Sequence, residues 1–201
     1  AIVEAAAQIA GERGYEGTSI KLVSDRSGLP ASSIYWHFKD KDELIAAVID
    51  RSFTDWIEAL TTIPDVPPGT SVEDLFVTGM RDAGEQLAKF PDFLRLGLML
   101  ILEQRPEEPA ARRRFHQARV ETLARVDGIY QLLFAGLSPN QTLRLARFTL
   151  AGSDGLFIAA NEGEVDLVQE FELLSHGILG AALSMGWSPQ DLPAEATGRP
   201  R

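Results

Sequence analysis

The chain of 201 residues contains no cysteine. It therefore has no disulfide framework, no thiolate metal site and no cysteine nucleophile. It also lacks an uninterrupted apolar run of about 18 residues, the length that predicts a membrane-spanning helix. The first residues show no signal-peptide pattern, so we expect a cytoplasmic protein with no membrane partner.

Basic residues are scarce. The chain has 19 Lys and Arg against 29 Asp and Glu, a formal net charge of −10. That balance argues against a general nucleic-acid coat protein. The excess acid lies mostly beyond residue 50, so the local potential of the first segment, rather than the total charge, decides whether it can approach DNA.

Motifs of common enzyme classes are missing from the sequence as well, among them GxSxG, HExxH and a phosphate-binding glycine loop. Glu172 and His176 lie one helical turn apart and could hold a metal, but the paired Glu-x-x-His set of di-iron bundles is lacking. His116 beside Arg112 to Arg114 could bind an anion, although a solvated basic helix face is the commoner explanation. We predict no catalytic residue, no metal and no cofactor, and keep a helical small-molecule- or metal-binding enzyme as the alternative.

A segment early in the chain predicts two short helices joined by a tight turn. Thr18 or Ser19 can cap the first helix. Gly28 suits an exit through a positive φ angle, and Pro30 fits the first turn of a second helix that runs to about Phe38. Two helices in this arrangement are typical of a helix-turn-helix.

The second of these helices is expected to present a polar and aromatic face. At about 100° per residue, Ile34 and Phe38 fall on one side, and Ser32, Ser33 and Trp36 lie roughly opposite. Serine hydroxyls suit base edges, and donor side chains suit phosphate oxygens. Taken singly, each residue is more often a cap, a core residue or part of a solvated face, but their combination favours DNA binding.

Residues 1 to about 48 resemble the N-terminal DNA-binding domain of the TetR/AcrR family of transcriptional repressors. The resemblance rests on the run IVEAAAQIAGERGYEGTS, the turn at Gly28 and Leu29, the SSIYWHF helix and Lys41. It implies two kinds of DNA contact: to bases from Ser32, Ser33 and Tyr35 with Lys21 beside them, and to phosphates from Thr18, Ser19, Trp36, His37 and Lys41. Ala31 belongs to the same predicted surface, although relatives often have a longer polar residue there, which reduces direct base contacts at that point.

Beyond this segment the sequence predicts helices throughout, and hence an all-α fold. We expect an N-terminal three-helix helix-turn-helix DNA-binding domain over residues 1–48. A larger helical effector-binding and dimerisation domain is expected over 49–188, followed by a mobile tail over 189–201. The later helices are predicted at about 41–60, 71–90, 91–104, 110–135, 139–160 and 165–185.

The last predicted helix has an apolar seam. Its members recur at alternating spacings of four and three, the pattern of nearly parallel or antiparallel helix packing: Leu167, Phe171, Leu174, Ile178, Ala181 and Met185. The pattern alone fits a core within one chain as well as an interface between two copies. The family resemblance favours the second reading, a homodimer through the last two helices.

The middle of the chain is rich in large, soft apolar side chains. Most are core residues, but they are also the natural walls of a cavity, with a few polar groups to orient a ligand. The predicted ligand-binding set is Phe76, Met80, Phe93, Leu96, Met99, Leu100, Glu103, Phe115, Arg119 and Tyr130. It suggests a small hydrophobic effector of unknown identity, and the resemblance implies a repressor that this effector releases from double-stranded operator DNA.

Overall fold

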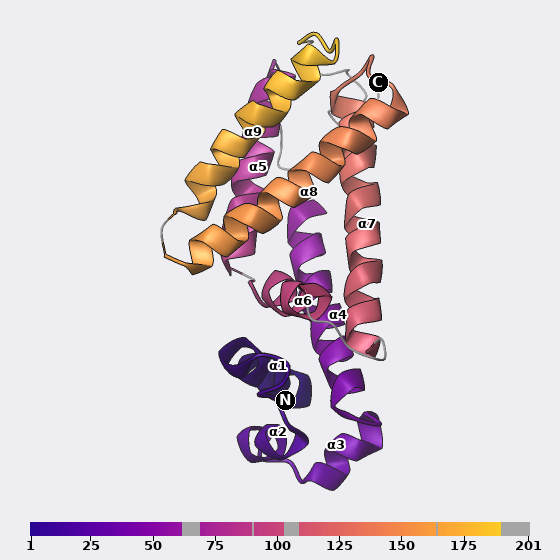
Figure 1. Ribbon diagram of the computed structural model, residues 1–201, viewed down its shortest axis with the longest axis vertical. Helices are drawn as coiled ribbons and strands as arrows, with labels where there is room; N and C mark the ends of the chain where they lie inside the picture. The colour runs from indigo at the N-terminus through magenta and orange to yellow at the C-terminus, as the bar shows by residue number, and fades with distance from the viewer. Residues whose placement is uncertain (62–68, 90, 103–108, 164, 190–201) are drawn as a thin grey trace. The chain divides into compact units, whose positions relative to one another are not determined.

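The computed structural model describes residues 1–61, 69–89, 91–102, 109–163 and 165–189 (Figure 1). Its regular elements are α-helices, which confirms the predicted all-α fold class. Among the described residues, no helix is both long and apolar enough to cross a bilayer. The helices are α1 (Ile2–Arg13), α2 (Ile20–Ser27), α3 (Ala31–His37), α4 (Lys41–Thr61), α5 (Val72–Lys89), α6 (Asp92–Leu102), α7 (Ala110–Leu133), α8 (Pro139–Asn161) and α9 (Leu167–Ser184).

The helix ends follow the local signals in the sequence. Ser19 caps α2, because its Oγ accepts a hydrogen bond from the backbone N of Leu22 at 3.3 Å. Gly28 leaves the same helix in the left-handed region with φ 71°, where a residue with a Cβ would be strained. At α5, the backbone N of Asp74 donates to Ser71 Oγ at 3.0 Å. The contacts at Ser19 and Gly28 confirm the start and the end predicted for α2.

The chain divides into two compact units. Unit 1 comprises residues 1–58 and 90–120, and unit 2 comprises residues 59–89 and 121–201. The helices of the predicted DNA-binding segment thus share a unit with α6 and the first part of α7. The functional division at residues 48 and 188 stays a prediction, and the predicted tail from residue 190 onwards lies outside the described residues.

Unit 1 has an aliphatic core and an aromatic one. Ile9, Val23 and Ile34 bring α1, α2 and α3 into the aliphatic core with at most 1% of their surface exposed. A second group, which we call the α4–α6–α7 aromatic cluster, consists of Phe53, Trp56, Phe93 and Phe115. The rings of Trp56 and Phe93 are stacked with centroids 5.6 Å apart, and the rings of Phe93 and Phe115 lie 5.1 Å apart.

Unit 2 is built around α9, which packs beside both α5 and α8 (Figure 1). At Gly84 of α5, an added Cβ would stand 3.1 Å from the Cβ of Phe171, so the two helices meet closely there. Phe76, Tyr130, Phe134 and Trp187 form a second aromatic cluster with neighbouring centroids 5.1 to 5.5 Å apart. These contacts bring the start of α5, the end of α7 and the residues after α9 into one core.

Tyr130 brings a polar group into this core. Its phenolic oxygen lies 2.7 Å from Thr149 Oγ1, and the Thr149 hydroxyl donates to the carbonyl of Leu145. The phenol is therefore the donor in the pair. Burial raises the pKa of Tyr130 well above its usual value, so it stays a neutral donor at physiological pH.

Candidate nucleic-acid interface

Helix α3 has one buried side and one open side. Ile34 is fully buried, whereas 82% of the Trp36 surface and 56% of the Tyr35 surface are exposed. An open hollow of about 310 Å³ on this helix is lined by Ser32, Ser33, Trp36 and His37. We call it the α3 hollow. The structure thus brings together several of the predicted DNA-contacting residues on one accessible surface.

Two predicted phosphate contacts are engaged with the protein itself. Thr18 is 1% exposed, and its hydroxyl donates to the carbonyl of Gly14 at 2.8 Å. Lys41 Nζ donates to the carbonyl of Tyr15 at 3.2 Å and lies 4.2 Å from the centre of the Tyr15 ring. These contacts order the connection between α1 and α2, so both residues shape the surface beside α3.

The remaining predicted contacts lie at helix starts. Ser19 is the exposed cap of α2, and Lys21 is exposed in the first turn of the same helix. Ala31 opens α3 and is half-buried. The DNA roles of all these residues stay predictions.

Two acidic side chains within residues 1–48, Glu12 and Glu43, accept hydrogen bonds from other groups of the protein. Glu12 and Arg26 form two hydrogen bonds of 2.7 and 2.9 Å between α1 and α2, and the hydrogen bonding from Arg26 lowers the pKa of Glu12. At the start of α4, the Glu43 carboxylate accepts from the backbone N of Lys39 at 2.6 Å. Because these carboxylates have partners within the protein, the charge that they present to an approaching phosphate is reduced.

Asp42 links two parts of unit 1. Its carboxylate accepts from the backbone N of Ala110 at 2.5 Å and of Ala111 at 3.3 Å, both at the start of α7, and from the Tyr15 hydroxyl at 3.3 Å. A carboxylate in this position satisfies amides that the first turn of a helix leaves without partners. The first turn of α4 is thereby tied to α7 and to the end of α1.

The predicted ligand-binding residues are divided between the units. In unit 1 the set comprises Phe93, Leu96, Met99, Leu100, Phe115 and Arg119, and in unit 2 it comprises Phe76, Met80 and Tyr130. Glu103 lies outside the described residues. Met99 differs from its neighbours, because it is 47% exposed and its Cε would stand 2.6 Å from a Cβ at Gly14. The other apolar members are buried.

The α4–α6–α7 aromatic cluster contains a polar atom that the sequence did not predict. The indole Nε1 of Trp56 is buried and has no hydrogen-bond partner. A buried donor without an acceptor costs free energy, and such groups often mark a place where a ligand or water binds. The guanidinium of Arg114 lies 5.3 Å from the centre of the neighbouring Phe53 ring and pairs with Asp50 at 2.6 Å.

Part of the predicted seam on α9 is buried within the single chain. Ile178 is fully buried and Phe171 is 3% exposed within the single chain. Phe171 packs against Gly84 of α5, and Leu174 stands 2.8 Å from a Cβ built at Gly152 of α8. Phe171 and Ile178 are therefore covered by the same chain, and the reading of these two residues as an intermolecular contact is wrong. Leu174, Ala181 and Met185 of the seam are only half-buried, and the homodimer through the last two helices stays a prediction.

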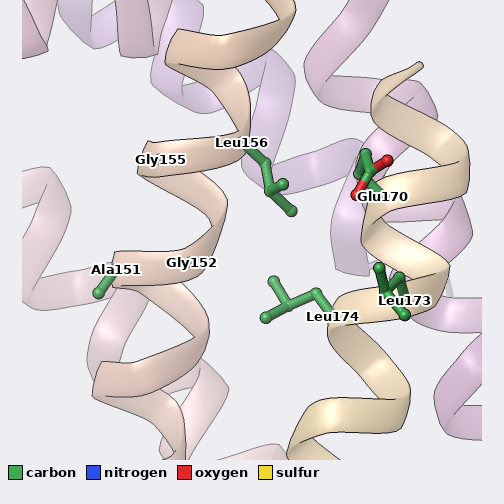
Figure 2. A pocket seen from close by; sticks show the side chains of 7 residues that line it. All are labelled: Ala151, Gly152, Gly155, Leu156, Glu170, Leu173 and Leu174. Carbon is green, nitrogen blue, oxygen red and sulfur yellow. The ribbon is translucent and has the colours of Figure 1, made fainter. Parts of the chain in front are cut away.

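A different side of α8 and α9 is open. Figure 2 shows Leu156 of α8 and Leu174 of α9 pointing toward each other across a hollow between the two helices. The hollow has a volume of about 350 Å³ and is also lined by Ala151, Gly152, Gly155, Glu170 and Leu173. Around it, exposed apolar and glycine residues form what we call the α8–α9 outer face: Phe148, Ala151, Gly155, Ile158, Leu173, Gly177, Gly180 and Leu183.

The weak metal-site candidate has another explanation. The Glu172 carboxylate forms a salt bridge with Arg81 of α5. Within the described ranges, no three histidine or carboxylate side chains are grouped as a metal ion would need.

The first part of the chain matches a known family. The model of the bacterial regulatory proteins of the tetR family matches residues 2–48. Over these residues the chain is similar to the TetR family. The match covers α1, α2, α3 and the first turns of α4, and it includes all four residues that line the α3 hollow.

Two curated proteins that are similar to this chain are named as transcriptional repressors. The chain matches only part of the length of each. The chain is 32% identical over 56 residues to the HTH-type transcriptional repressor KstR2 of Mycolicibacterium smegmatis, which is 28% of this chain and 27% of that protein. It is 27% identical over 116 residues to the HTH-type transcriptional repressor DhaR of Mycobacterium sp. strain GP1, covering 51% of this chain and 59% of that protein.

Solved structures extend the likeness in fold to about nine tenths of the chain. The fatty acid degradation regulator FadR of Bacillus halodurans has a TM-score of 0.70 at 17% identity, covering 89% of this chain and 96% of that one. FadR of Bacillus subtilis, solved in complex with stearoyl-CoA, has a TM-score of 0.65 at 20% identity, covering 91% and 96%. At these identities the likeness shows a shared fold.

Two residues of interest escaped prediction from the sequence. Asp42 sits in an ordinary acidic first turn of α4, and its partners at Ala110 and Ala111 are 68 and 69 residues away. Trp56 lies on α4 three residues after Phe53, a spacing that indicates only a common apolar face. The signal that marks Trp56, an unpaired indole N–H, exists only in the folded chain.

Proposed function

We propose that the chain is a sequence-specific DNA-binding repressor that acts as a homodimer and responds to a small hydrophobic ligand. The observation that carries this proposal is the α3 hollow, an open polar and aromatic surface opposite the buried Ile34, within the segment that matches the TetR family. Each subunit would place α3 in the major groove of one half of a near-palindromic operator.

The test of DNA recognition uses a duplex library with a randomised centre, from which the full chain selects its own site. Ser33→Ala is expected to blur the preference at one base-pair position, because a hydroxyl that contacts a base edge is lost. Lys39→Ala is expected to weaken binding to all DNA sequences by a similar factor. It should also reduce the slope of the logarithm of the binding constant against the logarithm of the salt concentration by about one unit. Fluorescence anisotropy at several salt concentrations measures both effects.

The two variants serve as controls for each other. Ser33 belongs to the α3 hollow, whereas Lys39 is exposed between α3 and α4 and does not line it. If the library yields no enriched sequence, the chain is not a sequence-specific regulator. If Ser33→Ala keeps the wild-type sequence preference at every position, the orientation proposed for α3 is wrong.

For the effector we propose a long-chain acyl thioester. FadR of Bacillus subtilis was solved with stearoyl-CoA, and this chain shares its fold. The α4–α6–α7 aromatic cluster offers an apolar environment, and the unpaired Nε1 of Trp56 offers a donor for a carbonyl oxygen. A ligand bound there would lower operator affinity only to the extent that it prefers the DNA-free arrangement.

Stearoyl-CoA is expected to lower the affinity for the selected duplex by about 5- to 150-fold, the usual range for such coupling. Titration calorimetry with and without the duplex should show the reciprocal loss of ligand affinity. Leu96→Ala, which changes a fully buried residue of α6, is expected to weaken ligand binding, whereas Met99→Ala at its half-exposed neighbour is not.

Free coenzyme A is the control for the nucleotide portion of this ligand. Equal binding of stearoyl-CoA to the free and the DNA-bound protein would overturn the proposed response. A Met99→Ala variant that lost binding as completely as Leu96→Ala would place the ligand elsewhere.

For the dimer we propose the α8–α9 outer face rather than the buried seam. Three of its members, Gly155, Gly177 and Gly180, have no other part of the chain within 4 Å of an added Cβ, so a partner helix can approach closely. Leu173 is 65% exposed beside them. An exposed apolar surface of this kind is typical of protein interfaces.

A further inference from the structure

The most exposed large side chain of the recognition surface is an indole. Trp36 is 82% exposed and forms one wall of the α3 hollow, which also includes Ser32, Ser33 and His37. A tryptophan normally buries much of its large apolar surface. Its exposure on the proposed DNA-binding side indicates that a partner covers the ring in the complex.

The Trp36 ring contacts its neighbour on a helix that is anchored to the core. The ring of His37 meets that of Trp36 edge to face, with centroids 4.7 Å apart and an angle of 85° between the planes. On the opposite side of the helix, Ile34 is fully buried and anchors α3 to the unit 1 core.

The chemistry of the α3 hollow selects among the groups that DNA presents. A phosphate oxygen would use only the indole N–H and would leave the faces of the ring in water. The major groove offers one apolar group at the base edges, the 5-methyl of thymine. Ser32 and Ser33 are short, so they leave room for that methyl beside the indole, and no carboxylate lines the hollow.

We propose that Trp36 is a specificity-determining residue that receives the 5-methyl group of one thymine per half-site in the α3 hollow. This assignment rests on the proposed DNA-binding function and differs from the phosphate contact that the family resemblance implies for Trp36.

The test removes single methyl groups from the DNA. In the duplex selected by the full chain, each thymine is replaced in turn by uracil, which pairs identically but lacks the methyl. At one position per half-site, the substitution is expected to weaken wild-type binding about fourfold, the loss that corresponds to one buried methyl group. Binding of the Trp36→Ala variant is expected to be equal for thymine and uracil at that position.

Two further variants separate this contact from general effects. Lys39→Ala should weaken binding to both duplexes and keep the fourfold ratio, because Lys39 lies outside the α3 hollow. Trp36→Phe should keep part of the ratio, since a smaller ring still covers the methyl.

The outcomes are distinguishable from failure of the proposed function. If no sequence is enriched, DNA recognition itself fails. If a sequence is enriched but no thymine responds to uracil, or if Trp36→Ala keeps the fourfold ratio, the role of Trp36 is refuted while DNA recognition stands. A selected site without thymine in either half also refutes it.

Discussion

Replacing Leu173 by glutamate is expected to convert the protein into a folded monomer that binds its operator at least about 100-fold more weakly. Leu173 is 65% exposed and lines the hollow between α8 and α9, so glutamate is tolerated in the single chain. In a dimer, the carboxylate would be buried without a partner, at a cost of about 3–5 kcal/mol. A monomer has only one DNA-binding segment, so it loses the gain in affinity from binding two half-sites at once.

Analytical ultracentrifugation, circular dichroism and DNA-binding anisotropy would measure these three consequences. Leu132→Glu is the matched control, because Leu132 is 71% exposed on α7 and lies outside the α8–α9 outer face. A Leu173→Glu variant that sediments as a tight dimer would exclude the proposed face. By contrast, Ile178→Glu is expected to unfold the subunit, because Ile178 is fully buried.

Gly97→Ala is expected to lower the free energy of unfolding by about 3 kcal/mol, at the upper end of typical overpacking costs. A Cβ at residue 97 would stand 1.8 Å from Cε2 of Phe115, far inside contact distance. Phe115 is fully buried and packs against Phe93, so its ring cannot move aside freely. Urea denaturation followed by circular dichroism gives the measurement.

A second substitution makes this prediction specific. Phe115→Leu removes the ring that meets Gly97, so the double variant should be more stable than the sum of the two single effects predicts. If the two effects are additive, the close approach of α6 to α7 is not the cause of the stability loss in Gly97→Ala. Gly128→Ala on α7 is the control, since an added Cβ there meets nothing within 4 Å.

Helix ends were predictable because they depend on neighbouring residues. Ser19, Gly28 and Ser71 act on backbone groups within a few positions, and each has the role that its type suggests. The open side of α3 was predictable for a similar reason, since a single buried residue, Ile34, sets the rotation of a short helix.

The partners of an apolar stripe were not predictable. The periodicity of α9 identified Phe171 and Ile178 as apolar contacts, but periodicity does not tell whether a helix of the same chain or of another covers them. The open face of α9 includes Gly177 and Gly180, whose lack of side chains makes it inconspicuous in a hydrophobic pattern. The grouping of Trp56 with Phe93 and Phe115 joins residues distant in sequence and required the folded chain.

Asp42 and α6 decide how this protein could be recombined with its relatives. A chimera that takes only residues 1–48 would leave the Asp42 carboxylate without the amides of Ala110 and Ala111. It would also separate Gly11 and Gly14 of the α1 region from Asp92 and Met99 of α6, which lie against them. The transferable piece is therefore discontinuous and consists of residues 1–58 together with 90–120. A DNA-binding segment exchanged at residue 48 would need new contacts with the α6 and α7 of the other protein.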